Sequence, residues 1–428
     1  MNQGKDTAAL SEWKLHWPLL LAATFGISFG GIPTTTLGLF MEPLQEAFGW
    51  SRTTISLGMT VFALAVIPLS PFVGAMVDRF GARAIAIPGL ALCGLSFAGF
   101  SLMNGMVVLW IGMWTIYSAM SVLIRTMVWN PAVAAAFVAN RGVALAIMLS
   151  GMSVASAVVP LLTHWLITEL GWRLAYVALG LGWTGVALLL VIPFFRVPKT
   201  SRQPRKPEAP AAAVEPPEEP ETVPGGLTFK QALRSVTIIR IALACLLATM
   251  LGSAWGVHMI PIYTSLGVER VTAASLAMVA GIAAIVARLV IGSILDRFYF
   301  GLMPFILLAL PALAYGLLLI SGGSLAIIML VALLIGVGSG ASLYLVIYLT
   351  TQYAGLRHFG KIYGTISMMT GISAGIGPLT AGWIFDTTGS YETYLIVGIP
   401  IFVLSGLLVM GLGPYPQFEP EPVPAANQ

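Results

Sequence analysis

Residues 74–83 read GAMVDRFGAR, and residues 292–301 read GSILDRFYFG. Both phrases follow a long apolar run, and both place an Asp-Arg pair four residues after a glycine. The two aspartates, Asp78 and Asp296, are 218 positions apart in a chain of 428 residues. A phrase that recurs after half the chain length indicates that the two halves are related by an internal duplication.

The duplication extends beyond this phrase, because other residues recur at the same offset in one unbroken register. Two halves in one register are expected to have the same structure in the same topology, related by a pseudo-twofold axis. The recurring pairs are Gly49 and Gly267, Arg52 and Arg270, Gly74 and Gly292, Arg79 and Arg297, Gly142 and Gly360, Pro160 and Pro378, Gly171 and Gly389, and Tyr176 and Tyr394.

The composition excludes a soluble protein. The chain is 58% hydrophobic and 9% charged, with a mean hydropathy of +0.92, whereas soluble domains carry about 25% charged residues. Apolar runs long enough to cross a bilayer predict an all-α integral membrane protein with twelve transmembrane helices in two six-helix pseudo-symmetric halves. The predicted spans are 16–40, 53–77, 84–103, 107–135, 143–168, 173–195, 237–264, 272–295, 302–321, 325–353, 361–385 and 392–413.

One connection between spans is long and rich in Pro, Glu, Lys and Arg, so it predicts a flexible linker. It divides the chain into an N-terminal half (1–195), a cytoplasmic linker (196–235), a C-terminal half (236–413) and a cytoplasmic tail (414–428). With the N-terminus in the cytoplasm, 16 of the 21 basic residues lie on that side and three on the other. This bias predicts a multi-pass protein of the cell membrane with both termini cytoplasmic.

Several classes of protein are disfavoured. The basic residues do not form a stripe with interleaved aromatics, which argues against a nucleic-acid partner. Cys93 and Cys245 lie in apolar runs and are expected to be buried thiols. No phosphate loop, nucleophile constellation or metal-ligand set is apparent, so we expect no enzyme activity, no cofactor and no metal. A non-transporting membrane sensor is disfavoured because the short cytoplasmic segments hold no signalling domain.

The 74–83 phrase resembles the signature loop between spans 2 and 3 of the major facilitator superfamily. Here the phrase supplies Gly74, Asp78, Arg79, Gly81 and Arg83, and the second half echoes it with Gly292, Asp296 and Arg297. The resemblance implies a transporter whose halves rock about a central site. We expect these residues to latch the cytoplasmic ends of the helices in one state and to release them in the other, with Gly74 allowing close helix approach.

Five shorter phrases resemble the branch of monocarboxylate transporters and oxalate:formate antiporters. They are FGWSR at 48–52, RGVALAIMLSG at 141–151, GWRLAY at 171–176, HMIPIYTSLG at 258–267 and ARLVIGSILDR at 287–297. This resemblance implies transport of small carboxylates, with a proton or by anion exchange. The chain departs from the branch in lacking a buried lysine in spans 1 and 11, and Ala284 stands where animal members carry an aspartate.

Arg288 is the leading candidate for binding substrate. It lies eight residues before Asp296, about 12 Å along a helix and therefore inside the hydrocarbon. Its neighbours Val286 and Val290 offer no partner, and an unpaired arginine at this depth costs about 2.5–3.5 kcal/mol on insertion scales. A substrate carboxylate would satisfy its planar fork. Arg288 also matches the carboxylate-binding arginine of span 8 in the resembling family; the alternative is a structural ion pair.

Arg125 is a second intramembrane arginine, sixteen residues before Arg141, and is not part of the family pattern. Because no span centre contains Asp or Glu, two such arginines favour a substrate with two negative groups, or one carboxylate plus another acceptor. The alternative for Arg125 is snorkelling or a contact with backbone carbonyls. We expect Pro131 to kink this span.

His258 is the best candidate for a proton or substrate role, since its unperturbed pKa lies near neutrality. A protonated substrate carboxyl is another route for the proton. Aromatic side chains that could line the cavity and hydrogen-bond a carboxylate are Tyr117, Trp255, Tyr344 and Tyr348.

The sequence therefore predicts a proton-coupled secondary transporter of small organic anions that works as a monomer surrounded by lipid. Its substrates are expected to be mono- or dicarboxylates, aromatic acids among them. A carboxylate exchanger and a drug or metabolite exporter remain alternatives. The exporter is disfavoured because Val159, not glycine, precedes Pro160 in span 5, and because two buried arginines repel cationic substrates.

Overall fold

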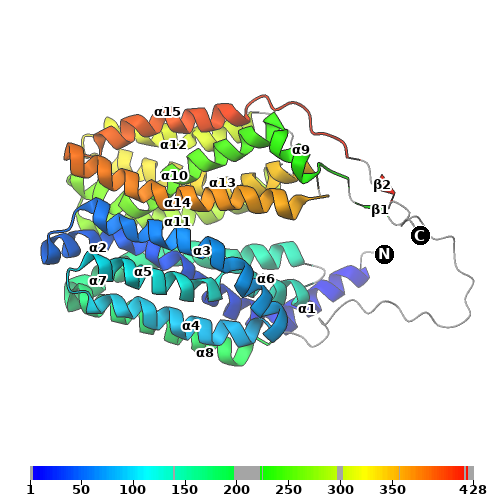
Figure 1. The fold of residues 1–428 in the computed structure, drawn as a ribbon, viewed down its shortest axis with the longest axis horizontal. Coiled ribbons are helices and arrows are strands. Elements are labelled where there is room, and N and C mark those ends of the chain that lie inside the picture. The colour runs from blue at the N-terminus through cyan, green and yellow to red at the C-terminus, as the bar shows by residue number, and fades with distance from the viewer. Residues whose placement is uncertain are drawn as a thin grey trace, which may run out of the picture.

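The computed structural model describes residues 3–137, 140–196, 222–223, 225–295, 302–355, 357–418 and 421–422. Its helices form two bundles that lie side by side (Figure 1), one from each half of the sequence. Both chain termini lie beyond the same end of the bundles, which we call the terminal end; the opposite end is the distal end.

The N-terminal bundle contains six membrane-length helical paths, and three of them are interrupted. Their elements are α1 (Gln3–Ser28), η1 (Phe29–Gly31), α2 (Ile32–Phe48), α3 (Arg52–Phe80), α4 (Ala82–Ala98), η2 (Gly99–Leu102), α5 (Val107–Ser121), η3 (Val122–Ile124), α6 (Thr126–Ala136), α7 (Arg141–Val177), the π-helical turn η4 (Ala178–Trp183) and α8 (Thr184–Phe194).

The C-terminal bundle consists of α10 (Val236–Ser265), α11 (Arg270–Leu295), α12 (Met303–Leu319), α13 (Leu325–Ala354), α14 (Phe359–Thr388) and α15 (Glu392–Val409). The twelve predicted spans therefore each correspond to an observed helical path, and the predicted fold is confirmed. Within the described residues, nine helical stretches are long and apolar enough to cross a membrane, and one of them, Arg141–Phe194, contains two spans.

The duplication is also visible in the backbone. Three pairs of glycines at the 218-residue offset adopt a positive φ, a conformation that side chains other than glycine rarely tolerate. Each pair ends or joins equivalent helices, so the two halves turn at equivalent places. The pairs are Gly49 (φ 66°) and Gly267 (φ 83°), Gly105 (φ 91°) and Gly323 (φ 82°), and Gly171 (φ 78°) and Gly389 (φ 70°).

Small residues form much of the contact between the two halves. A methyl group added at Gly375 of α14 would lie 2.6 Å from Ala63 of α3, and one added at Gly281 of α11 would lie 2.9 Å from Ala157 of α7. Gly38 of α2 faces the Val257 carbonyl of α10 in the same way. Glycine at such positions lets helix backbones approach closely, which brings α3 beside α14 (Figure 1).

Each half has its own aromatic core. In the N-terminal half, Trp110, Trp114 and Tyr117 are at most 2% exposed, and their rings pack against Phe100. In the C-terminal half, a second cluster contains Trp255, Tyr263, Tyr315, Tyr394 and Phe402. Tyr315 and Tyr394 share a hydrogen bond of 2.7 Å, and the Tyr394 hydroxyl donates to the Leu251 carbonyl. Rigid packing inside each half suits two bodies that move relative to one another.

The predicted linker contains one ordered helix that its composition did not predict. Thr228 and Gln231 form a capping box at the start of α9 (Phe229–Arg234), in which the Thr228 amide donates to the Gln231 side chain over 2.8 Å. Next to it, β1 (Thr222–Val223) pairs antiparallel with β2 (Glu421–Pro422) of the tail. The T-x-x-Q pattern of this capping box is the sequence signal from which α9 could have been predicted.

The packing makes a prediction about Gly151. An added Cβ there would collide with the Thr24 backbone carbonyl, whereas at Gly112 it would meet no atom within 4 Å. We expect Gly151→Ala to lower stability by about 1–3 kcal/mol, as overpacking does. The check is the unfolding midpoint of the purified protein. Gly112→Ala, also inside a helix, is the matched control and should leave the midpoint unchanged or raise it; equal effects of the two substitutions would contradict the packing argument.

Candidate functional site

A carboxylate from one half caps a helix of the other half at the distal end. The Asp386 side chain of α14 accepts hydrogen bonds from the Arg52 amide (3.0 Å), the Thr53 amide (2.8 Å) and the Thr53 hydroxyl (2.5 Å) at the start of α3. The first amides of a helix lack intrahelical acceptors and carry the positive end of its dipole. Asp386 therefore supplies the charge and the acceptors that the N-terminus of α3 needs.

The Arg52 side chain adds a second contact between the halves. Its guanidinium lies 3.6 Å from the centre of the Phe385 ring and 5.1 Å from that of Tyr391, both from the C-terminal half. Its Nε and Nη1 atoms are buried without a hydrogen-bond partner among the described residues. The distal contact is extended by an ion pair between Glu42 of α2 and Arg270 of α11.

His258 lies behind this contact and is fully buried. Its Nε2 atom lies 2.9 Å from the Pro378 carbonyl and 3.1 Å from the Ser56 hydroxyl, and its Nδ1 atom lies 2.7 Å from the Tyr391 hydroxyl. Because a carbonyl only accepts, Nε2 carries the proton, and Nδ1 accepts from Tyr391. Neutral His258 is fully hydrogen-bonded, and Ser56 is its partner from the other half.

We call this assembly the distal gate, formed by Arg52, Thr53, Ser56, His258, Asp386 and Tyr391. One further bond lies just inside it, from the Thr60 hydroxyl to the Gly375 carbonyl (2.8 Å). These hydrogen bonds and the Glu42–Arg270 ion pair, which join the two six-helix halves, all lie at or just inside the distal end.

The signature loop lies at the terminal end. Asp78 and Arg79 are exposed, and Arg79 stacks over its neighbour Phe80 at 5.2 Å. A Cβ on Gly74 would meet no atom within 4 Å, so the expected close approach of a helix at Gly74 is not made in this conformation. In the second copy, Gly292 belongs to α11, while Asp296 and Arg297 lie outside the described residues.

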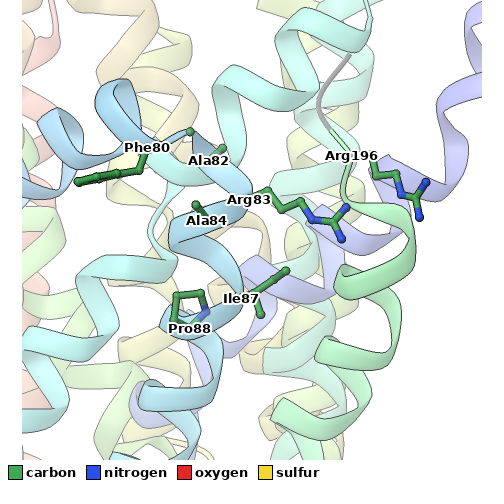
Figure 2. Close-up of a pocket in the computed structure, with 8 residues that line it drawn as sticks. Phe80, Ala82, Arg83, Ala84, Ile87, Pro88 and Arg196 are labelled. Atoms are coloured by element: carbon green, nitrogen blue, oxygen red, sulfur yellow. The ribbon is translucent and has the colours of Figure 1, made fainter. Parts of the chain in front are cut away.

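Arg83 of the signature loop holds the end of another helix in its own half. Its guanidinium donates to the carbonyls of Ile192 (2.6 Å) and Phe195 (3.2 Å), so a cation caps the C-terminus of α8. Figure 2 shows Arg83 directed toward α8, with Arg196 nearby, on the wall of an open pocket of about 670 Å³. The remaining walls are mainly apolar and come from Phe80, Ala82, Ala84, Ile87 and Pro88.

Arg288 lies on the face of α11 that meets the N-terminal half. Gly281, seven residues earlier, contacts Ala157 of α7, and residues seven apart share a helix face. Ala284, one turn earlier, contacts Gly340 of α13. The Arg288 side chain is half-buried, and its Nε is a buried donor with no partner among the described residues. Among the described residues no partner for this guanidinium is found, and it lies about 10 Å along the helix from the Gly281 contact toward the terminal end.

Arg125 lies where the fourth span breaks. The helix stops at η3, Arg125 itself is extended (φ −73°, ψ 167°), and α6 starts at Thr126. The Arg125 guanidinium lies 5.2 Å from the centre of the Phe62 ring, and no hydrogen bond or ion pair to this side chain is found in the described parts of the chain. The predicted kink is therefore present, but it precedes Pro131 by six residues.

The structure separates the aromatic candidates from one another. Tyr117 packs in the N-terminal aromatic core, where its hydroxyl is buried and lacks an oxygen or nitrogen partner among the described residues. Trp255 packs in the C-terminal core, with its ring centroid 5.3 Å from that of Tyr315. Tyr348 is partly buried and contacts Tyr415. Tyr344 belongs to α13, and its side chain lies outside what is described.

Sequence reasoning missed Asp386, Thr53 and Tyr391 altogether. Their proximity depends on how the two halves meet, which no local pattern reports. One local signal was present: Ser51 is an N-cap residue whose hydroxyl accepts from the Thr54 amide, so the start of α3 was readable. The carboxylate that completes this cap comes from 334 residues away.

Residues 21–364 match the sequence profile of the Major Facilitator Superfamily. The chain belongs to this superfamily. It is accordingly a multi-pass membrane protein of a transporter family, whose members carry small-molecule substrates.

The chain is similar in sequence to two kinds of curated monocarboxylate transporter. Human monocarboxylate transporter 6 is 25% identical over 421 residues, which cover 92% of this chain and 79% of the relative. Mouse monocarboxylate transporter 14 is 39% identical over 82 residues, which cover 19% of this chain and 15% of the relative.

Solved structures of the superfamily show the same fold. A bacterial homologue of the human lysosomal transporter Spinster has a TM-score of 0.68 at 17% identity, and a D-xylose–proton symporter has a TM-score of 0.71 at 13% identity. In each comparison the match covers 93% of this chain and 98% of the other.

The distal gate makes a prediction about Asp386. Removal of an N-cap side chain costs about 1 kcal/mol, so Asp386→Ala should shift the equilibrium toward opening of the distal end by roughly fivefold. Spin labels at Glu46 and Glu392, exposed on the distal ends of opposite halves, would report this as a larger population of long distances. Thr387→Ala is the control, since the Thr387 hydroxyl bonds within its own helix. An unchanged distance distribution in Asp386→Ala would show that the gate does not depend on this cap.

Proposed function

We propose that this protein is a secondary active transporter of small organic anions of the carboxylate class. The observation that carries the proposal is the Arg288 fork. It is half-buried, lacks a partner among the described residues and lies on the face of α11 that meets the other half. A guanidinium in that position is costly unless an anion completes it, and a carboxylate matches its paired donors.

The relatives support the same substrate class. The curated relatives are monocarboxylate transporters, and the match to the human relative extends over nearly the whole chain. We therefore assign a carboxylate group of the substrate to the Arg288 site. Because a nucleotide-binding loop is absent from the sequence, gradients of substrate and protons are the proposed source of energy.

Alternating access follows from the arrangement of the contacts. In the described structure the hydrogen bonds between the halves lie at the distal end, so a substrate at Arg288 would exchange with the terminal side. Opening of the distal gate would expose the same site to the distal side, while the signature loop would close the terminal end. The excess of basic residues at the terminal end supports the proposal that this end faces the cytoplasm.

One candidate carrier of the proton is the substrate carboxyl, which pairs with Arg288 as a carboxylate and can leave it as the neutral acid. His258 is the other candidate carrier, yet in the closed gate it is fully buried and its two nitrogens are hydrogen-bonded. In this conformation it can therefore not release a proton to the terminal side. We assign His258 to the closing of the gate.

Uptake into proteoliposomes tests the function. Wild-type protein should accumulate a labelled monocarboxylate faster when an inward proton gradient is imposed. Arg288→Ala should lower this uptake by about 10- to 100-fold, the loss expected for a charged hydrogen bond of 1.5–3 kcal/mol. Arg288→Lys keeps the charge but loses the paired donors of the guanidinium, so its uptake rate should lie between those of the wild type and Arg288→Ala.

The control for the Arg288 variants is Arg173→Ala, which removes an exposed arginine that donates to the Ser101 carbonyl far from Arg288. It should transport as the wild type does. Absence of uptake of every monocarboxylate tried, by protein with a normal unfolding midpoint, would overturn the proposal.

The role given to His258 makes a separate prediction. A glutamine side chain can donate to the Pro378 carbonyl and accept from Tyr391, but it does not titrate. His258→Gln should therefore keep stimulation by the proton gradient while the maximal rate falls less than about tenfold, as for loss of one hydrogen bond of about 1 kcal/mol. Loss of the stimulation, with exchange of substrate for substrate intact, would instead identify His258 as the proton carrier.

A further inference from the structure

The second intramembrane arginine has no counterpart in the duplicated half. At the 218-residue offset, Leu343 corresponds to Arg125, and Ser70 corresponds to Arg288. The helix α13 passes through Leu343 without a break, whereas the N-terminal half interrupts its helix at Arg125. The fold common to both halves therefore requires neither the arginine nor the break.

The break concentrates positive charge and free donors. The Val128 amide bonds back to the Arg125 carbonyl over 2.9 Å, but no acceptor for the Thr126 and Met127 amides is found in the described residues. The positive end of the α6 dipole thus begins at the backbone of Arg125, a residue that itself carries a positive charge, and such a helix start favours an anion. Discontinuous helices of membrane transporters use their half-helix N-termini to hold anionic groups.

A third polar group lies at the break. The Tyr117 side chain is fully buried, and its hydroxyl has no oxygen or nitrogen partner among the described residues; the Cys93 thiol, a weak hydrogen-bond partner, lies next to it. Both groups lie within electrostatic range of Arg125. By contrast, the carbonyl freed by the break at Ile124 is satisfied, since the Trp129 indole donates to it over 2.8 Å. Acceptors at the break are therefore covered, while donors remain available.

The break and Arg288 lie at compatible depths. Phe62, beside Arg125, is ten residues from the distal start of α3, about 15 Å along the helix. Arg288 is 18 residues from the distal start of α11, about 27 Å. The two positions therefore differ in depth by about 12 Å.

We infer that the break at Arg125 is a second anion subsite, formed by the Arg125 guanidinium, the first amides of α6 and the Tyr117 hydroxyl, and that it binds the second carboxylate of a short dicarboxylate. This inference rests on the proposed function, because Arg288 holds the first carboxylate. One arginine from each half then binds one carboxylate of the substrate, so a diacid bridges the two halves that move relative to each other during transport.

The experiment compares two four-carbon acids, butyrate and succinate, which differ in the second carboxylate. Binding to the purified full-length protein is measured at neutral pH by the ligand-induced rise of the unfolding midpoint, and uptake is measured in proteoliposomes. Wild-type protein should bind succinate at least about tenfold more tightly than butyrate. Arg125→Ala should abolish this preference and leave butyrate affinity within about twofold of wild type. Arg288→Ala should weaken both acids.

Thr126→Pro is a second variant that tests the helix amides without removing a charge. Proline is tolerated at the first position of a helix and removes its amide donor, and the extended backbone of Arg125 is the conformation that a following proline requires. It should lower the preference for succinate in part. Arg173→Ala, with the same change of charge at an exposed position, should leave the preference unchanged.

The outcomes separate this inference from the proposed function. If butyrate is bound and transported but succinate is no tighter, the carboxylate function stands and the second subsite is overturned. If Arg125→Ala weakens both acids equally while its unfolding midpoint without ligand is unchanged, Arg125 does not discriminate the second carboxylate and the inference fails. If neither acid is bound or transported, the proposed function itself fails. Should Arg125→Ala not fold, the response of Thr126→Pro decides.

Discussion

The capping of α3 by Asp386 is the interaction on which the observed arrangement of the two halves depends. Each half is rigidly packed around its own aromatic core, and the surface between the halves is made largely of small residues. Small residues allow close approach but give little direction. The three hydrogen bonds to Asp386, with Arg52 stacked behind them, supply that direction at one end. The two halves are thus held together at the distal end.

The requirement that buried polar groups have partners also accounts for the two intramembrane arginines. Within hydrocarbon every polar group requires a partner, and helix termini, carbonyls and hydroxyls in this protein mostly find one nearby. Arg83 donates to the end of α8, and Trp129 covers the carbonyl at Ile124. Arg288 and Arg125 depart from the rule among the described residues, as do Arg52 and several buried indole and hydroxyl groups. A cation inside a span that lacks a protein partner is best explained by an anion that binds and leaves.

Most of the fold was predictable from the sequence because a segment that crosses hydrocarbon must be apolar and of a minimum length. The duplication then showed that the twelve spans divide into two equivalent sets of six. Arg288 was predictable for the same reason, since a charge inside a span stands out. The distal gate was not predictable: Asp386 and Arg52 are ordinary residues at helix ends, and their meeting depends on the packing of α3 against α14. Trp255 shows the converse, because it was predicted to line the cavity, yet it packs in the C-terminal core.

The aromatic cores have a consequence for spectroscopy. Of the 11 tryptophans, nine belong to the N-terminal half, while the C-terminal half has Trp255, which is buried, and Trp383, which is 60% exposed. Intrinsic emission is therefore dominated by one moving body. With Trp383 replaced by phenylalanine, Trp255 becomes a single emitter for the other body, so light from the same chain can follow each half separately through a transport cycle.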